Sequence, residues 1–237
     1  MTRILKALSD ISADYDALFC DLWGCVHDGI RPYPAAVTAL QSFRAKGGKV
    51  VLVTNSPRPR ASVEDQLARI GVPRDAWDTI ASSGDSARTA MFEGAVGQKV
   101  YFIGDGDTDE GFFTPLKILD QPLEITRVPL SEAEGIVCTG PFDPLADPAV
   151  YRGDFLYAKT KGLKLLCANP DIVVDRGDIR EWCAGALAAL YTEMGGESLY
   201  FGKPHPPIYD LARRRLAALT GLSPDESRIL AVGDGIA

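Results

Sequence analysis

The stretch of sequence that decides the fold is residues 17–24, which read ALFCDLWG. The run Ala17–Cys20 is apolar and too short for a helix, and it stops abruptly at Asp21. This pattern predicts a buried strand that ends in a carboxylate. A carboxylate in that place is held by rigid backbone and suits a nucleophile or a metal ligand. Taken alone, Asp21 fits the ordinary alternative of a turn or cap aspartate better.

Short apolar runs alternate with helical periods around this stretch. Residues 4–11 predict a short amphipathic helix, and residues 34–46 predict a longer helix that is closed by glycines. Residues 49–53 are apolar and β-branched and predict a second strand, which is followed by a helix over residues 63–70. Strands that are apolar on both faces and alternate with helices predict a parallel sheet covered on both sides.

The late part of the chain repeats this arrangement. Residues 198–201 predict a strand, residues 207–219 a helix, and residues 228–232 a last strand. Polar clusters therefore follow four predicted strands, and in a parallel sheet chemistry collects at the carboxyl ends of the strands.

A second set of strands lies between these two parts, at residues 99–103, 135–138 and 163–167, and it alternates with helices such as residues 181–194. We therefore predict an α/β fold with a Rossmann-like parallel-sheet core and an inserted α/β cap domain. The core is expected to comprise residues 1–83 and 197–237, and the cap residues 84–196, with the active cleft between them. Because the sequence stops directly after its last predicted strand, we expect the core to be incomplete at its carboxyl end.

The composition excludes several classes of partner. The chain has 237 residues, with 32 acidic against 25 basic ones and a net charge of −7, so it has no general attraction to nucleic acid or anionic lipid. Its longest nearly apolar stretch, Cys183–Tyr191, is too short to span a membrane, and the amino terminus lacks a signal-peptide core. We expect a cytoplasmic protein with neither a nucleic-acid nor a membrane partner; a homo-oligomer stays open.

Four polar clusters carry the candidate chemistry. Asp21 is the first, and the second is Thr54 and Asn55, whose hydroxyl and amide beside backbone N–H groups suit anionic oxygens. Lys203 offers a compact cation that could neutralise a phosphoryl group. Asp234 follows the last strand and could hold a hard divalent ion together with Asp21. Each cluster alone has an ordinary reading as a turn or a solvated surface residue.

The order of the clusters is far more specific than any one of them. It runs strand-Asp, strand-Thr-Asn, a long insertion, Gly-Lys-Pro, then strand-Gly-Asp, and it resembles the haloacid dehalogenase (HAD) superfamily of phosphotransferases. The insertion, together with residues 53–55 (VTN), 168–171 (ANPD) and 202–206 (GKPHP), is similar to the class IIA branch of NagD-like and p-nitrophenyl-phosphatase-like proteins.

This resemblance implies a Mg²⁺-dependent phosphatase that acts on a small phosphorylated metabolite, of the sugar phosphate or nucleotide monophosphate type. Asp21 would attack phosphorus to form an aspartyl-phosphate, which water then hydrolyses. Mg²⁺ would be held by Asp21, the backbone carbonyl of Trp23 and Asp234. Thr54 and Lys203 would grip the phosphoryl oxygens, and Lys203 would also orient the nucleophile.

The resemblance also places Asn169 and Asp171 on the cap side, near the substrate. The sequence departs from the family at Trp23, where related phosphatases usually carry an aspartate that acts as general acid and base. An indole cannot exchange that proton. His27 is an alternative proton donor, although a loop histidine can equally be a turn residue.

Two other functions stay open because of this departure. One is a phosphometabolite-binding protein that is catalytically weak or inactive on the same scaffold. The other is hydrolysis of carbon–halogen or carbon–phosphorus bonds, since such branches of the superfamily also vary the position of Trp23.

Overall fold

The computed structural model describes residues 4–106, 110–116, 118–176 and 178–235. The chain forms two compact units. The first comprises Met1–Thr54, Glu64–Ala81 and Tyr209–Ala237, and the second comprises Asn55–Val63 and Ser82–Ile208. The core and cap boundaries expected from the sequence stay a prediction, and the segments 55–63 and 197–208 belong by their contacts to the second unit.

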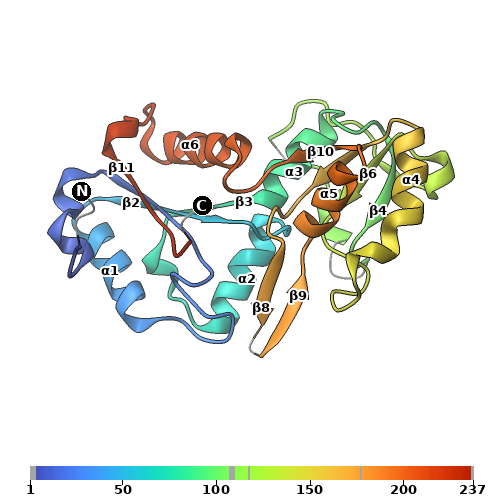
Figure 1. The fold of residues 1–237 in the computed structure, drawn as a ribbon. Coiled ribbons are helices and arrows are strands. Elements are labelled where there is room, and N and C mark those ends of the chain that lie inside the picture. Colours follow the sequence, from blue (N-terminus) through green and yellow to red (C-terminus); the bar gives the residue numbers. More distant parts are fainter. Residues whose placement is uncertain (1–3, 107–109, 117, 177, 236–237) are drawn as a thin grey trace. The chain divides into compact units, whose positions relative to one another are not determined.

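The first unit contains a four-stranded sheet with the strand order β11-β1-β2-β3. Its strands are β1 (Ala17–Cys20), β2 (Lys49–Thr54), β3 (Thr79–Ser82) and β11 (Ile229–Val232). Helices α1 (Pro34–Ala45) and α2 (Arg60–Ile70) lie on one side of this sheet, and α6 (Pro206–Thr220) lies on the other (Figure 1). Short 3-10 turns connect them at Leu8–Asp10, Ser12–Asp14, Arg74–Ala76 and Glu226–Arg228.

The central strands form where the sequence predicts them because their side chains are buried on both faces. All four residues of β1 are buried, and β1 pairs in parallel with both β2 and β11. Helix α1 turns one apolar stripe inward, formed by Val37, Leu40 and Phe43.

The amphipathic helix predicted over residues 4–11 is wrong. The structure has 3-10 turns there, and the first two residues of the apolar stripe, Ile4 and Leu5, are exposed rather than packed. The carboxylate of Asp10 accepts the backbone N–H groups of Lys6 and Ala7, which gives the backbone an alternative to helical hydrogen bonds.

The second unit contains a five-stranded sheet with the order β10-β7-β6-β4-β5. Its strands are β4 (Lys99–Ile103), β5 (Thr126–Arg127), β6 (Gly135–Cys138), β7 (Lys164–Cys167) and β10 (Glu197–Tyr200), and β8 (Val173–Arg176) and β9 (Ile179–Trp182) form a separate antiparallel pair. Its helices are α3 (Ser83–Phe92), α4 (Arg152–Thr160) and α5 (Ala184–Glu193), with 3-10 turns at Glu110–Phe113, Leu130–Glu132 and Pro148–Tyr151.

Alternate residues of this sheet enter two separate cores. In β6, Ile136 and Cys138 pack in the cluster that contains α4 and α5, whereas Val137 packs in the cluster that contains α3. In β7, Leu165 and Leu166 divide in the same way. A parallel sheet buried on both faces needs this continuous apolar character. The predicted α/β fold class, with parallel sheets covered by helices, is confirmed.

Two predictions about elements of the second unit need correction. The strand predicted at residues 198–201 exists as β10, but it pairs with β7 in the five-stranded sheet and does not belong to the sheet of β1 and β2. The helix predicted over residues 181–194 begins only at Ala184, because Glu181 and Trp182 pair with β8 as part of β9. In both cases the sequence pattern predicts that a strand or helix is present, but it does not show which strand a segment pairs with.

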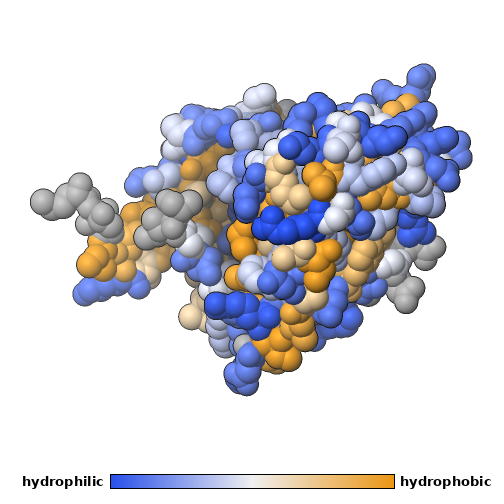
Figure 2. All heavy atoms as spheres, turned by 45° about the vertical axis from the view of Figure 1, so that its right-hand side comes forward, coloured by the Kyte–Doolittle hydropathy of each residue, from blue (hydrophilic) through white to orange (hydrophobic). Residues whose placement is uncertain are grey.

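Apolar side chains are dispersed among hydrophilic ones on the face of the molecule that Figure 2 shows. Within the described part of the chain, no helix has both the length and the apolar character that a membrane span requires.

Candidate functional site

Three of the predicted site residues leave the same end of the four-stranded sheet. The register places Cys20 of β1 opposite Leu52 of β2 and Val232 of β11. Asp21 follows Cys20 directly, while Thr54 and Asp234 each lie two residues past their register partner. Because the three strands are parallel, these residues meet at one edge, the carboxyl end, of the sheet.

Asp21 is fixed by hydrogen bonds of its own backbone and side chain. Its N–H donates to the carbonyl of Val232 at 2.9 Å, which extends the β1–β11 ladder by one residue. Its Oδ1 accepts the N–H of Leu22 at 2.7 Å. The carboxylate is thus oriented by rigid backbone and is only half-buried. Thr54, at the end of β2, is buried.

The carboxylate of Asp234 lies directly against the loop that follows Asp21. Gly24 has a φ of +77°, and a Cβ built on it would lie 2.1 Å from Oδ2 of Asp234. Only glycine permits both this backbone conformation and this approach. The loop is closed by the N–H of Gly24, which donates to the carbonyl of His27 at 3.0 Å, and by the N–H of Val26, which donates to that of Leu22 at 2.8 Å.

The oxygen donors at this edge fit a hard divalent cation. Within the described residues there is no cluster of three or more His, Cys, Asp or Glu side chains suited to a metal ion. A cation would therefore rely on the carboxylates of Asp21 and Asp234 together with backbone oxygens, such as the Trp23 carbonyl, and water. Mg²⁺ is characteristically bound in this way, through one or two carboxylates and several waters.

Trp23 and His27 form a packed pair in the same loop. Their rings meet edge to face with centroids 5.4 Å apart, and a Cβ on Gly29 would lie 2.5 Å from the indole. His27 is 2% exposed, and its Nδ1 accepts the N–H of Gly29 at 3.0 Å. Burial lowers the pKa of His27 despite the nearby charges of Asp28 and Asp21, so the ring is neutral at pH 7. A neutral buried imidazole favours a packing role over proton donation.

A second group of predicted residues comes together within the second unit. The side-chain amide of Asn55 contacts the backbone of Lys203 twice: its Oδ1 accepts the Lys203 N–H at 2.6 Å, and its Nδ2 donates to the Lys203 carbonyl at 3.1 Å. The same Nδ2 donates to Oδ1 of Asp171 at 2.8 Å. Asn169 Oδ1 in turn accepts the N–H of Asp171 at 3.0 Å. Residues more than one hundred positions apart in the sequence are therefore linked directly.

The residues around this group are tightly packed. A Cβ on Gly202 would lie 2.5 Å from Oδ1 of Asn55 and 2.5 Å from Cδ of Pro170, so the glycine is required for the contact. The N–H of His205 donates to the carbonyl of Gly202 at 2.8 Å, and the His205 ring stacks on Tyr200 with centroids 4.7 Å apart. The loop that carries Lys203 is thereby held on several sides.

The start of α3 contains residues that sequence reasoning missed. The hydroxyl of Ser83 donates to the carbonyls of Ser56 and Ala168, at 3.0 and 2.5 Å, and joins the segments that carry Asn55 and Asn169. A Cβ on Gly84 would lie 2.2 Å from the carbonyl oxygen of Pro57. The only signal in the sequence is the run of small residues at 82–84 (SSG), which equally fits an ordinary helix start.

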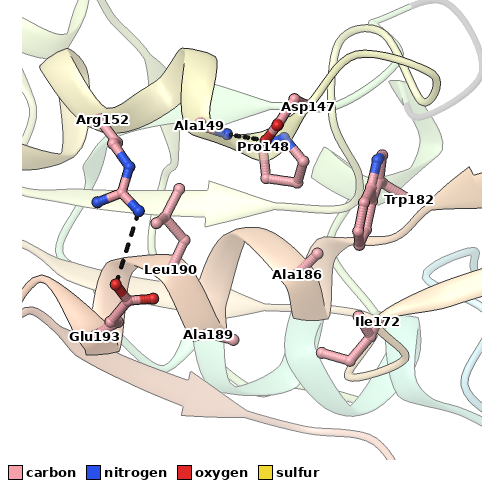
Figure 3. Close-up of a pocket in the computed structure, with 10 residues that line it drawn as sticks. All are labelled: Asp147, Pro148, Ala149, Arg152, Ile172, Trp182, Ala186, Ala189, Leu190 and Glu193. Atoms are coloured by element: carbon pink, nitrogen blue, oxygen red, sulfur yellow. Dashed lines mark hydrogen bonds and ion pairs between the residues drawn. The ribbon is translucent and has the colours of Figure 1, made fainter.

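An open pocket of about 300 Å³ lies elsewhere in the second unit (Figure 3). Trp182 and Ile172 form its apolar end, and Arg152 and Glu193 approach each other across the other end at 3.7 Å. None of the residues predicted for the site lines this pocket.

Comparisons with known protein families and solved structures identify proteins that are similar to this chain. The family described as haloacid dehalogenase-like hydrolases matches residues 18–113. A crystal structure from Brucella suis, titled a hydrolase of the haloacid dehalogenase-like family, is 42% identical, with a TM-score of 0.89 over 98% of this chain and 82% of that chain. A comparison with curated proteins gives no match.

More distant structures share the fold. A 4-nitrophenylphosphatase from Thermotoga maritima is 18% identical, with a TM-score of 0.67 over 95% of this chain and 80% of that chain. A glycerol phosphate phosphatase from Mycobacterium tuberculosis, in complex with magnesium, is 22% identical, with a TM-score of 0.63 over 86% of this chain and 60% of that chain. The fold is that of the p-nitrophenyl-phosphatase-like branch predicted from the motifs.

Proposed function

The chain belongs to the haloacid dehalogenase-like family of hydrolases, and on that basis we propose that it is a Mg²⁺-dependent phosphatase of a small phosphorylated metabolite, of the sugar phosphate or nucleotide monophosphate type. The observation that carries the proposal is the register that brings Asp21, Thr54 and Asp234 to one edge of the sheet. Structural neighbours that are titled phosphatases, one of them in complex with magnesium, support it.

In this proposal Asp21 is the nucleophile. Its carboxylate oxygen forms a bond to phosphorus while the bond from phosphorus to the leaving oxygen breaks, which gives an aspartyl-phosphate and the dephosphorylated product. Water then attacks phosphorus, the bond to Asp21 breaks, and inorganic phosphate is released. The hydrogen bond from the N–H of Leu22 to Asp21 Oδ1 holds the carboxylate in a fixed orientation.

The remaining residues bind and orient the phosphoryl group. The hydroxyl of Thr54, the backbone N–H of Asn55 and the ammonium of Lys203 are proposed to bind its oxygens. Asp21, Asp234 and the Trp23 carbonyl would hold Mg²⁺, which when bound offsets the repulsion between the carboxylate and the phosphoryl oxygens. Asn169 and Asp171 are proposed to lie near the organic part of the substrate.

The leaving group receives little help from general acid catalysis in this proposal. Trp23 carries no proton that it can exchange, and the buried, neutral His27 is a weak candidate for the task. The enzyme should therefore turn over aryl phosphates, whose leaving group departs without a proton, faster than sugar phosphates or nucleotide monophosphates.

The test is release of inorganic phosphate by the full-length protein from a panel of phosphate monoesters, with and without Mg²⁺. We expect Mg²⁺-dependent release that Asp21→Asn abolishes. Asp14→Asn is a suitable control, because Asp14 lies in a 3-10 turn before β1 and not at the carboxyl edge of the sheet. Release that is absent from the wild type, or that persists in Asp21→Asn, would refute the proposal.

A second candidate function rests on Trp23 in the place of the usual acid and base. The protein would then bind a phosphometabolite without turning it over. In that case ligands of the panel raise the thermal midpoint but no phosphate appears, and Asp21-dependent turnover excludes this function.

The partner proposed for either function is a small phosphorylated molecule. The net charge of −7 gives no general attraction to nucleic acid, and the cytoplasm is the compartment we propose. A homo-oligomer is compatible with both functions, and size-exclusion chromatography with light scattering would detect it.

A further inference from the structure

We propose that Asn55 is a positioning residue, whose side-chain amide fixes the backbone of Lys203 while Asp171 fixes the amide. Lys203 would thereby present its ammonium group from one defined place. This inference rests on the proposed function, in which Lys203 holds the phosphoryl group. It gives the side chain of Asn55 a different role from the direct phosphate contact expected from the sequence.

The hydrogen-bonding capacity of the Asn55 amide carries the inference. A primary amide has two N–H hydrogens and one carbonyl oxygen. Nδ2 donates to Asp171 at 2.8 Å and to the Lys203 carbonyl at 3.1 Å, so both hydrogens are engaged within the protein. A phosphoryl oxygen accepts hydrogen bonds and does not donate them, so the side chain has no hydrogen left to offer it. Asn55 is also buried, with only 8% of its surface exposed.

The partners determine which way the amide faces. Lys203 N–H is a donor and requires the Oδ1 of Asn55, whereas the Lys203 carbonyl and the Asp171 carboxylate are acceptors and require Nδ2. All three contacts are satisfied by one orientation and none by the reversed one. The carboxylate of Asp171 makes its hydrogen bond charge-assisted and therefore stronger than a neutral one.

Asp171 is itself held in place by the backbone around it. Its N–H donates to Oδ1 of Asn169 at 3.0 Å, and its carbonyl accepts the N–H of Gly185 at 3.1 Å. A Cβ on Gly185 would lie 2.5 Å from that carbonyl, so α5 begins in close contact with Asp171. The chain of contacts thus runs from α5 through Asp171 and Asn55 to Lys203.

A lysine side chain is flexible, so a fixed backbone helps to position its ammonium group. Its ammonium stands on a flexible stem of four carbons and loses about 2 kcal/mol of side-chain entropy when it is fixed. Fixing the backbone on both sides of the residue limits the region that the ammonium can reach. A displacement of about 1 Å at a catalytic group can cost roughly 10²-fold in rate, so the support acts on turnover more than on substrate affinity.

The first test needs no activity. Hydrogen exchange of the Lys203 backbone amide is measured by NMR in the wild type, in Asn55→Ala and in a matched control, Asp175→Asn, which removes an exposed carboxylate of the β8–β9 pair. We expect exchange at Lys203 to be at least about tenfold faster in Asn55→Ala only. Unchanged exchange in Asn55→Ala would overturn the inference.

The second test is a double-mutant cycle on phosphate release, with Lys203→Met as the other variant. For a positioning residue, Asn55→Ala lowers kcat about 10²-fold with little change in KM, and it lowers kcat less than about twofold further in the Lys203→Met background. If Asn55 binds phosphate directly, KM rises and the two losses multiply, which would overturn the inference.

An exchange of partners guards against variants that do not fold. Asn55→Asp sets a carboxylate against the carboxylate of Asp171. Combining it with Asp171→Asn places an amide N–H donor at position 171 opposite a carboxylate acceptor at position 55. We expect the double variant to be more active and more protected at Lys203 than Asn55→Asp, and equal behaviour would count against the inference. If the wild type releases no phosphate, the proposed function fails, while hydrogen exchange still decides the positioning role.

Discussion

The loop after β1 combines an oriented carboxylate, that of Asp21, with a tightly packed indole, that of Trp23. Asp21 leaves the sheet next to Asp234 and Thr54, whereas Trp23 is packed between His27 and Gly29. In the proposed mechanism, the indole stands at the sequence position where related phosphatases usually carry an aspartate.

Trp23→Asp should increase turnover of alkyl phosphates strongly and that of p-nitrophenyl phosphate only slightly. General acid–base catalysis typically contributes about 10²- to 10⁴-fold, and it matters most for a poor leaving group. The measurement is kcat/KM for both substrates in the wild type and the variant. Equal effects on both substrates would show that Trp23 does not limit proton transfer.

Gly24→Ala should weaken binding of Mg²⁺. The added Cβ would lie 2.1 Å from Oδ2 of Asp234, so either the loop or the carboxylate must move. Gly47→Ala is the matched control, because Gly47 has a φ of +95° and nothing within 4 Å of its Cβ. Titration calorimetry with Mg²⁺ should show a loss of affinity of about tenfold or more for Gly24→Ala alone. Equal affinity in the two variants would contradict the proposed role of Asp234.

The placement of Asp21, Thr54 and Asp234 could be predicted from the sequence because Thr54 ends β2, and Asp21 and Asp234 lie within two residues of the ends of β1 and β11. It could not show that His27 is buried or that the Asn55 amide is engaged by Lys203 and Asp171. Both facts depend on tertiary contacts, and in the case of Asn55 on partners more than one hundred positions away.

Among the individual elements, strands were predictable where apolar side chains pack on both faces of a sheet. The strands predicted at residues 99–103 and 135–138 coincide with β4 and β6, since their side chains are packed on both faces. The sheet to which β10 belongs was not predictable. A short apolar run predicts a buried strand, but tertiary packing determines which of the two parallel sheets the strand joins.

Asp78 joins α1 to the β2–β3 ladder and provides a test of stability. Its carboxylate accepts two hydrogen bonds from Arg44, at 2.8 and 3.0 Å, and the N–H of Val50 at 2.8 Å. Burial alone would raise the pKa of Asp78, but the hydrogen bonds from Arg44 and Val50 lower it overall. The native state therefore favours the ionised carboxylate.

Asp78→Asn should lower the free energy of unfolding by about 1 to 3 kcal/mol at pH 7, because charge-assisted hydrogen bonds are lost. Since the native pKa lies below the ordinary value of 3.8, this contribution is present above that value and disappears as the pH falls through the native pKa. Urea unfolding from pH 7 down to about pH 3 should show the difference shrinking. A difference that is constant with pH would contradict the role of the charge.

At the scale of the whole molecule, the chain builds two parallel sheets, each with its own apolar packing. The first sheet is completed by β11, near the end of the chain, which pairs with β1, near its start. The second sheet and its two cores are formed by the long segment between them. The alternation of strands and helices was enough to predict an inserted α/β unit, whereas the role of segment 55–63 in that unit depends on contacts such as the one from Ser83 to Ser56.

If Asp21 carries the phosphoryl group during turnover, the aspartyl-phosphate can be trapped on this residue. The full-length protein is mixed with p-nitrophenyl phosphate and Mg²⁺, quenched, treated with borohydride, and digested for mass spectrometry. We predict that Asp21 is converted to homoserine only when both substrate and Mg²⁺ are present. Phosphate release at a normal rate, with Asp21 never reduced and another residue modified instead, would show that Asp21 is not the nucleophile.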